Sequence, residues 1–477
     1  MRIPRLLLVG AIVVVFTGCG TSTGLRMPGG PAPVRISGIT AFSGIGPVKY
    51  YVDRANPNCS DSGAGTETQP FCTIGRAARV TKAGETAQVA AGTYAEEVSV
   101  ANSGSAGAPV ALVAAPGATV TVTGQRYGFR ISGRSWVTIR GFTVTRTTDA
   151  GIYVYSASHI VLEGNTVSHA ARRGGIYLYL SSYVTVQGSD VSYSGTPSSD
   201  NLAPGIVVRD TTDTRIANNS VHHNSNHGIY VIYASTRVEI VGNRIFGNDR
   251  GPEQRGAAGI EVRSRGNLIA GNIAYDNQDS GINLRGDGHD NLVVNNVSYN
   301  NRDHGIDVLK VTGNRIIGNT VYKNAVDGIS VEGGSTGTLV ANNISVDNGI
   351  NNSASSGNLW VSADSIPGTT ADHDILYHSV PGQTLVRWGS KRYSSLAAFV
   401  AATGMERNGI EADPRWRDPA GGDFRLLEGS PAIDSADSGV SGQQDTDAEG
   451  RPRRDDPGTP NTGTGPRLYD DRGAYEY

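Results

Sequence analysis

Arginine and carboxylate side chains recur at alternate positions of three short segments in the second half of the chain. Glu261, Asn283 and Asp307 each stand two residues after the glycine of a Gly-Ile dipeptide, and Arg263 and Arg285 stand two residues further on. Alternate side chains of a β-strand point to one face, so we expect these residues to share one outward surface. Because guanidinium groups pair with carboxylates bidentately, this surface suits an acidic ligand.

Tyrosines occupy the same outward positions in earlier segments. A Tyr ring combines an apolar face with a polar hydroxyl and can stack on a sugar ring. The predicted substrate-binding residues are Tyr153, Tyr155, Tyr177, Tyr179, Arg209, Tyr230 and Asn283. The alternative is that the Tyr columns are stacking ladders that stabilise a sheet, which does not exclude binding.

Two arginines and a lysine could carry out β-elimination on a uronate sugar, a reaction that needs a neutralised carboxylate and a base. Arg263 and Arg285 are the predicted neutralising groups. Lys310 is the predicted base, because Lys is scarce here (5 of 41 basic residues) and cationic neighbours lower the pKa of an ammonium group. His304, with His227, is predicted to lie near the rim as a second acid or base. The charged columns could instead be a solvated salt-bridge face, and the two histidines could be turn residues.

Four carboxylates could hold a calcium ion. Ca²⁺ binds carboxylate oxygens, and the predicted ligands are Glu261, Asp307, Asp279 and Asp303, with Asp287 nearby. Either Ca²⁺ or the arginines would neutralise the substrate. The competing interpretation is that Asp279, Asp303 and Asp327 occupy turns, where Asp is common for backbone reasons.

A repeat of about 23 residues must position these side chains. It is marked by a Gly-Ile dipeptide, or Gly-Phe once, at Gly128, Gly151, Gly175, Gly205, Gly228, Gly259, Gly281, Gly305 and Gly328. We expect these glycines to supply tight turns that other residues resist. Extra residues interrupt the spacing in two places, 195–204 and 248–258, where loops could wall a groove.

Two ladders of mostly Asn follow the same period. One contains Asn165, Ser189, Asn219, Asn243, Asn272, Asn296, Asn319 and Asn343, and the other contains Asn224, Asn248, Asn277, Asn301, Asn324 and Asn348. Parallel coils stack about 4.8 Å apart, so equivalent Asn amides can hydrogen-bond from coil to coil. The sequence therefore predicts an all-β fold, a right-handed parallel β-helix (a solenoid of about 23-residue coils) with end caps.

Composition agrees with many strands and turns. Gly accounts for 63 of 477 residues and charged residues for only 18%. A length of 477 would suggest about three domains, but the repeat predicts one solenoid instead. The net charge of 41 − 44 = −3 gives no sign of a nucleic-acid partner.

Residues 1–19 are typical of an export signal. Arg2 and Arg5 precede an apolar run over 6–16 that is too short to span a bilayer. Phe16-Thr17-Gly18-Cys19 resembles the bacterial lipobox, although that pattern prefers Leu where Phe16 stands. Lipidation of Cys19 would attach the protein to the cell membrane, and ordinary cleavage near Gly18 is the alternative. Residues 20–48, rich in Gly, Pro, Ser and Thr, form a predicted flexible linker.

The other two cysteines, Cys59 and Cys72, predict a disulfide, because export leads to an oxidising compartment. A metal pair would need His or Cys partners, and none stand nearby. These cysteines fall in a predicted N-terminal strand and helix cap over 49–95, with an amphipathic helix at 73–84. The β-helix is predicted over 96–350, and C-terminal coils with a capping region over 351–477.

The two ends of the mature chain resemble those of bacterial secreted right-handed parallel β-helix proteins. The resemblance rests on segments 50–53, 69–74, 92–94, 413–419, 422–426, 429–434 and 473–477. Relatives include pectate lyases, the family-nine type in particular, alginate lyases and mannuronan epimerases. The resemblance implies that the Gly-Ile segment is the first strand of each coil and that the turn before it walls the substrate groove.

The Asp pattern of β-helix polygalacturonases and the Asp-Pro-His string of the epimerases are missing from the coils. We therefore expect an exported, lipid-anchored or secreted monomer on the bacterial cell surface. It would be a polysaccharide lyase acting on an acidic (uronate) polysaccharide, with Ca²⁺ as a candidate cofactor. A non-catalytic glycan-binding or adhesion β-helix is the alternative.

Overall fold

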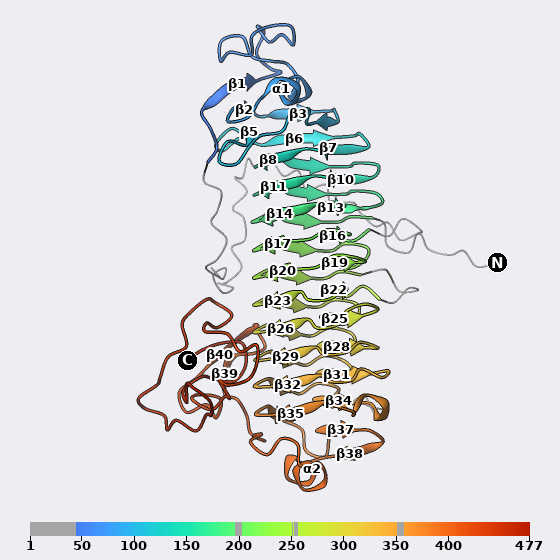
Figure 1. Cartoon of the computed structure of the whole chain (residues 1–477), viewed down its shortest axis with the longest axis vertical. Helices are drawn as coiled ribbons and strands as arrows, with labels where there is room; N and C mark the ends of the chain where they lie inside the picture. Colours follow the sequence, from blue (N-terminus) through green and yellow to red (C-terminus); the bar gives the residue numbers. More distant parts are fainter. Residues whose placement is uncertain (1–43, 196–202, 250, 252–255, 351–356) are drawn as a thin grey trace, which may run out of the picture. The chain divides into compact units, whose positions relative to one another are not determined.

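The computed structural model describes residues 44–195, 203–249, 251, 256–350 and 357–477. The predicted signal, Cys19 and most of the linker lie outside the described residues. Within the described part, no helix is both long and apolar enough to cross a bilayer. The chain forms a parallel β-solenoid of about 12 turns, which confirms the predicted fold class (Figure 1).

Three sheets run along the solenoid, and each coil contributes one short strand to each sheet. We call them sheets A, B and C. Sheet A contains β1 (Val48–Val52), β2 (Thr86–Val89), β5 (Val110–Ala114), β8 (Ser135–Arg140), β11 (Ser158–Glu163), β14 (Ser182–Gln187), β17 (Thr214–Ala217), β20 (Val238–Val241), β23 (Leu268–Ala270), β26 (Leu292–Val294), β29 (Arg315–Ile317), β32 (Leu339–Ala341) and β35 (Thr370–Asp372).

Sheet B contains β3 (Gly92–Tyr94), β6 (Val120–Thr123), β9 (Thr143–Thr145), β12 (Thr166–Ser168), β15 (Asp190–Ser192), β18 (Ser220–His222), β21 (Arg244–Phe246), β24 (Ile273–Tyr275), β27 (Val297–Tyr299), β30 (Thr320–Tyr322), β33 (Ile344–Val346) and β36 (Ile375–Tyr377).

Sheet C holds the Gly-Ile segments. It contains β4 (Val98–Ser99), β7 (Tyr127–Ser132), β10 (Ala150–Tyr155), β13 (Gly174–Tyr179), β16 (Ile206–Arg209), β19 (Ile229–Ile232), β22 (Ile260–Arg263), β25 (Ile282–Arg285), β28 (Ile306–Leu309), β31 (Ile329–Glu332), β34 (Leu359–Val361), β37 (Val386–Trp388) and the antiparallel β38 (Lys391–Tyr393).

The core lies inside the coils and is made of stacked β-branched and leucine side chains. Ile229 pairs in register with Ile260, and Val231 with Val262, and all four are fully buried. β-Branched residues suit such pleated, packed surfaces. Their alternation with outward residues fixes which side chains sheet C presents to solvent.

Both predicted ladders are present as chains of buried hydrogen bonds. Nδ2 of Asn272 donates to Oδ1 of Asn296 at 2.9 Å, and Nδ2 of Asn277 donates to Oδ1 of Asn301 at 3.0 Å. A third ladder, at the turn between sheets C and A, was not predicted. There Asn267 donates to Oδ1 of Asn291, whose backbone N–H donates to Oδ1 of Asn314.

The Gly-Ile glycines are required by close approach between coils and not by turn geometry. None of them has a φ in the left-handed region. A Cβ on Gly281 would lie 2.0 Å from Oγ of Ser298 and 2.7 Å from Nδ2 of Asn301. The expectation that they supply tight turns is therefore wrong, although their recurrence marks the coils correctly.

The N-terminal end of the solenoid is covered by α1 (Ile74–Val80), within the predicted helix. Oγ1 of Thr73 accepts from the backbone N–H of Arg76, which caps the helix start. Ile74, Ala77 and Ala78 are buried in the main core. Cys59 and Cys72 form a disulfide with an S–S distance of 2.05 Å in the loop before α1.

The C-terminal residues divide into two parts. After the short helix η1 (Ala363–Ser365), α2 (Leu396–Thr403) covers the end of the solenoid, where Phe399 packs against Trp388. The tail from 413 onward, with β39 (Trp416–Asp418) and β40 (Asp423–Leu426), lies along the side of the solenoid instead (Figure 1). Trp416 and Phe424 pack there against Tyr322 of sheet B.

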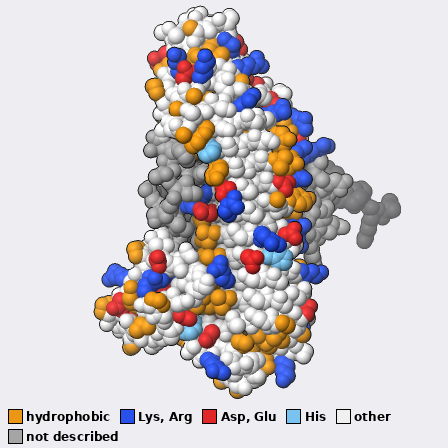
Figure 2. All heavy atoms as spheres, viewed as in Figure 1, with side chains coloured by type: hydrophobic (Ala, Val, Ile, Leu, Met, Phe, Trp, Pro, Cys, Tyr) orange, Lys and Arg blue, Asp and Glu red, His pale blue; other side chains and the backbone are white. Residues whose placement is uncertain are grey.

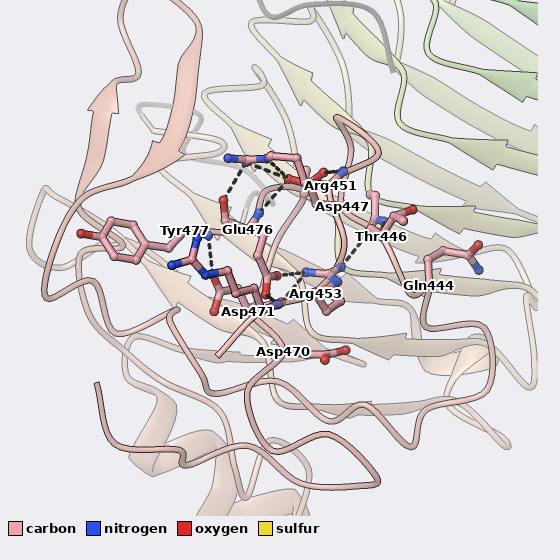
Figure 3. A network of polar contacts seen from close by, with 12 residues as sticks. Gln444, Thr446, Asp447, Arg451, Arg453, Asp470, Asp471, Glu476 and Tyr477 are labelled. Atoms are coloured by element: carbon pink, nitrogen blue, oxygen red, sulfur yellow. Dashed lines mark hydrogen bonds and ion pairs between the residues drawn. The ribbon is translucent and has the colours of Figure 1, made fainter. Parts of the chain in front are cut away.

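A buried ion pair holds this tail in place. Nη1 of Arg453 donates to Oε2 of Glu476 at 2.8 Å, and Nη2 donates to Oδ1 of Asn295 on the solenoid at 3.2 Å. Figure 3 shows Arg453 and Glu476 at the centre of a wider polar network that includes Asp447 and Arg451. The predicted capping region over 351–477 thus contains α2, which covers the end of the solenoid, and a tail that lies along its side.

Candidate functional site

The outward columns of sheet C have the register that the repeat predicts. Tyr230 pairs with Glu261, Glu261 with Asn283, and Asn283 with Asp307. In the neighbouring outward column, Arg285 pairs with Leu309 and Leu309 with Glu332. The predicted side chains therefore share one face over successive strands.

Glu261 lies at the centre of a cationic cluster. Its carboxylate is fully buried and accepts from Nε and Nη2 of Arg285 at 2.9 and 2.8 Å, and from Nε of Arg263. Nε2 of His227 lies 3.3 Å from Oε2 of Glu261. Since both carboxylate oxygens are engaged, Glu261 positions the arginines and has no free oxygen for a metal ion.

His227 is neutral in this cluster. Burial lowers the pKa of His227 to about 4. Its Nδ1 accepts from the backbone N–H of Ala258 at 3.1 Å, so the proton of the neutral ring is on Nε2, which faces Glu261. His227 thus orients Glu261.

A second cluster gathers three groups that could ligate a metal ion. One ligand atom each from His304, Asp307 and Glu332 lie within 4.8 Å of one another. Nε2 of His304 is 3.5 Å from Oδ1 of Asp303, whose carboxyl also hydrogen-bonds that of Asp279. Three of the four predicted calcium ligands therefore come together here, and Glu261 lies two strands away.

Burial raises the pKa of Asp307 to about 8, and nearby carboxylates add to the shift. Burial also raises the pKa of Asp303 to about 6. For His304 burial favours the neutral ring, but the carboxylates of Asp327, Asp307 and Asp303 outweigh it and raise the pKa to about 10. The raised pKa values of the two carboxyls thus reflect burial and the crowding of acidic groups around the imidazolium of His304.

Three buried oxygen atoms in the first outward column have no hydrogen-bond partner within the described part of the chain. They are Oδ1 of Asn283, Oδ1 of Asp307 and Oγ of Ser330, and the three residues follow one another in register. A buried polar atom without a partner costs free energy. A cation or a ligand hydroxyl bound here would supply the missing interactions.

A pocket of about 570 Å³ opens beside both clusters. Arg285 lines it from the cationic cluster, and Asp279 and Asp303 line it from the acidic one. Its other lining residues are Gly256, Gln278, Arg302 and Val326. It lies at the start of the sheet C strands, on the side where the resemblance places the groove wall.

Lys310 lies at the opposite end of β28 from this pocket. It is exposed at the corner that follows Leu309, with a φ of 59°, and carbon atoms of its side chain pack beside Gly333. The structure therefore does not bring the predicted base together with Asp279 or Asp303. His304, at the other end of the strand, does join the cluster.

The predicted tyrosines form a stacked column on the first half of sheet C. The rings of Tyr153 and Tyr177 lie 6.0 Å apart, and Tyr127, which was not predicted, stacks on Tyr153 at 4.8 Å. Tyr155 and Tyr179 lie beside them with a ring separation of 5.4 Å. The column is thus a stacking ladder, the interpretation that the sequence left open beside binding.

Four contributors to this face were not predicted as site residues. Glu332 occupies an outward position, Asp327 was expected only in a turn, and Tyr127 and Arg173 had no predicted role. Asp327 lies one position before a Gly-Ile dipeptide, as His304 and His227 do. That shared position could have indicated its role, because residues just before a Gly-Ile dipeptide lie at the start of the sheet C strands.

Comparison with known families identifies the architecture. The family model for the right handed beta helix region matches residues 118–256 and 253–366, which together span more than half of the chain. The chain belongs to the right-handed β-helix family. A second model, the Pel9A-like right handed beta helix region, matches residues 50–180 of this β-helix protein.

Solved structures agree on the fold. The crystal structure of pectate lyase Pel9A matches with a TM-score of 0.53 and 18% identity, over 90% of this chain and 96% of that one. XylC in complex with xylose matches with a TM-score of 0.54 and 13% identity, over 77% of this chain and 87% of that one. At these identities the likeness is one of fold.

One curated relative is the uncharacterized protein YwoF of Bacillus subtilis (strain 168), 30% identical over 128 residues. That match covers 24% of this β-helix protein and spans 27% of the length of YwoF.

Proposed function

We propose that the outward face of sheet C binds an acidic polysaccharide and cleaves it by β-elimination. One observation carries the proposal: Arg285, held by the fully buried Glu261, lines the same pocket as Asp279 and Asp303. Side chains of Arg263 and Arg285 are 38% and 29% exposed, so their guanidinium groups can still reach a ligand. A uronate carboxylate bound there would be neutralised, which makes its α-proton more acidic.

The acidic cluster fits a divalent cation. Asp279, Asp303 and Asp307 supply the oxygen ligands that Ca²⁺ prefers, and the unpartnered Oδ1 of Asp307 is one of them. A bound cation would supply further neutralisation of the substrate carboxylate. Asp327, whose Oδ2 lies 3.3 Å from Nδ1 of His304, would hold the imidazole in place.

Two groups are candidates for the base that removes the proton. Lys310 is the sequence-based candidate. Glu332 has the stronger geometric case, because its Oε1 lies 3.9 Å from Nε2 of His304 and the group shares the cluster with Asp307. We therefore assign the base to Glu332 and keep Lys310 as the residue to test beside it.

The test is incubation of the purified protein with pectate, alginate and glycosaminoglycans, with Ca²⁺ or with a chelator. An ultraviolet-absorbing unsaturated product is expected from at least one polymer. Arg285→Ala and Glu332→Gln should each lower kcat about a hundredfold. Lys323→Met, which changes an exposed lysine elsewhere, is the control for Lys310→Met. Absence of product from every polymer would reject the lyase.

Glycan binding without turnover is the second candidate, favoured by the stacked tyrosines and the arginines that cover them. In that case the same variants would weaken retention on a glycan column, with no turnover to lose. We propose attachment to the cell membrane through a lipid on Cys19 whether the protein is a lyase or a binding protein. If Cys19 is lipidated, Cys19→Ala should move the protein from the membrane fraction to the medium.

A further inference from the structure

The first half of sheet C carries guanidinium groups laid over tyrosine rings. The guanidinium of Arg173 lies 5.7 Å from the ring centre of Tyr153 and 5.6 Å from that of Tyr177. Its side chain is 40% exposed, and Nε pairs with Oδ1 of Asp149 at 3.0 Å. A cation held on an aromatic face keeps its position at little entropic cost and still meets solvent.

Arg209 repeats this arrangement one strand further on. Its guanidinium is 4.9 Å from the ring centre of Tyr179 and 4.8 Å from that of Tyr233. Nη1 also donates to the hydroxyl of Tyr177 at 3.3 Å, which ties Arg209 to the Tyr column. The side chain is 37% exposed, so the group is both fixed and accessible.

The charges of sheet C are therefore divided along the solenoid. Exposed Arg126, Arg130 and Arg172 add to Arg173 and Arg209 at the start, whereas Asp303, Asp307 and Glu332 gather further on. Figure 2 shows hydrophobic and basic side chains together over the upper part of the solenoid. A polyanion meets attraction throughout the first half, whereas in the second half it meets Arg263 and Arg285 together with repulsion from the acidic cluster.

From these contacts we infer that Arg173 and Arg209, on the Tyr column, form a distal subsite that anchors an anionic glycan chain without a metal ion. Five strand steps separate Tyr177 on β13 from Asp307 on β28, or about 24 Å at the usual strand spacing. Only a chain of several sugar rings covers that distance, so the subsite selects long polymers over short ones. The inference takes the place of cleavage from the proposed function, whereas the binding of the glycan at this subsite does not depend on it.

The test measures binding in the presence of a chelator, which removes divalent metal ions. Fluorescent long oligogalacturonate and oligoalginate are the anionic probes, and a xylan oligomer of similar length is the neutral probe. Arg173→Ala with Arg209→Ala should weaken anionic binding about tenfold at low salt. The control is Arg146→Ala with Arg237→Ala, which removes two exposed arginines away from sheet C and should change binding less than twofold.

If the first double variant does not fold, Arg130→Ala with Arg172→Ala removes two exposed cations from the same region. Unchanged affinity of a folded variant for both anionic probes, or equal binding of the neutral probe, overturns the inference. If the lyase proposal also holds, the variant should lose kcat/KM on polymer and keep it on trimers. If no lyase activity is found, the binding measurements in chelator still decide whether the subsite exists.

Discussion

Glu261 illustrates how burial decides the role of a single carboxylate. By type and position it resembles a calcium ligand, yet its oxygens are taken by Arg263, Arg285 and His227. Asp307, two strands away in the same column, is equally buried but keeps an oxygen without a partner. The same residue type therefore positions cations in one coil and offers a ligand in another.

Replacing Glu261 by Gln should lower the free energy of unfolding by about 1–3 kcal/mol, because two arginines and a histidine lose their charged partner. The partial exposure of both arginines limits the loss. Chemical denaturation measures it. Asp213→Asn removes the exposed pair with Arg237 and should cost less than about 1 kcal/mol. Equal losses in the two variants would contradict this account.

Residue types and spacing were enough to predict which side chains face outward from sheet C. They were not enough to predict which outward groups pair with one another. Lys310 and His304 both flank β28, but they lie at opposite ends of the strand, and only His304 meets the carboxylates. Such pairing depends on the direction of side chains at the corners of a coil. The alternating pattern of a strand does not predict that direction.

At the scale of elements, the Asn ladders hold neighbouring coils together at their turns. Asn272 accepts from both the backbone and the side chain of Asn243, and donates to Asn296 and to the carbonyl of Ile240. All of these bonds are buried. Removing one amide therefore leaves partners in both neighbouring coils unsatisfied.

Asn272→Ala should lower the free energy of unfolding by about 3 kcal/mol, because several buried groups lose a partner that water cannot replace. Asn300→Gly changes an exposed Asn with positive φ and is the control, expected to change stability by less than about 1 kcal/mol. Thermal unfolding followed by circular dichroism compares the two. A cost for Asn272→Ala no larger than that of the control would show that the ladder is dispensable.

Gly281→Ala should be more damaging than an ordinary Gly→Ala change in a strand. The added methyl group would meet Oγ of Ser298 at 2.0 Å and the carbonyl oxygen of Gly305 at 3.0 Å. Gly281→Ala with Ser298→Ala relieves the first of these contacts and should recover part of the lost stability. Yields of soluble protein and melting temperatures give the comparison, and a single variant as stable as the wild type would refute the packing argument.

At the scale of the whole molecule, a short helix covers each end of the described solenoid, and the C-terminal tail lies along its side. The fold class and the helix at the N-terminal end could be predicted, since periodicity and helix-like segments are local signals. The lateral position of the tail could not. It depends on contacts such as Arg453 with Asn295, which are separated by 158 residues and leave no periodic trace.

Asp374 and Glu406 make stability depend on pH at the C-terminal end. Both are fully buried, and burial raises the pKa of Asp374 to about 6 and that of Glu406 well above its ordinary value. Carboxyls with raised folded-state pKa values stabilise most below their unfolded pKa of about 4. This contribution is lost as the pH rises through about 6 and beyond.

The melting temperature should therefore fall between about pH 5 and pH 8, and Glu406→Gln should reduce that fall, because an amide can donate to Asp374 without titrating. Arg472, which donates to the backbone carbonyl of Asp374, offsets part of the buried charge. Melting curves at a series of pH values for both proteins provide the measurement. Parallel curves would mean that this pair does not titrate in the folded protein.

The first Asn ladder also has a direction. From Asn219 onward each amide donates toward the C-terminal end and accepts from the N-terminal side, and the series stops at Asp374, which can only accept while its carboxyl is ionised. The side-chain hydrogen bonds of this ladder therefore all run in one direction and end at Asp374. A duplicated coil inserted before Asn343 would join donors to acceptors without a mismatch, whereas one appended after Asp374 would find no amide to continue from. The solenoid could therefore be lengthened by duplicating an internal coil, but not by adding a coil after Asp374.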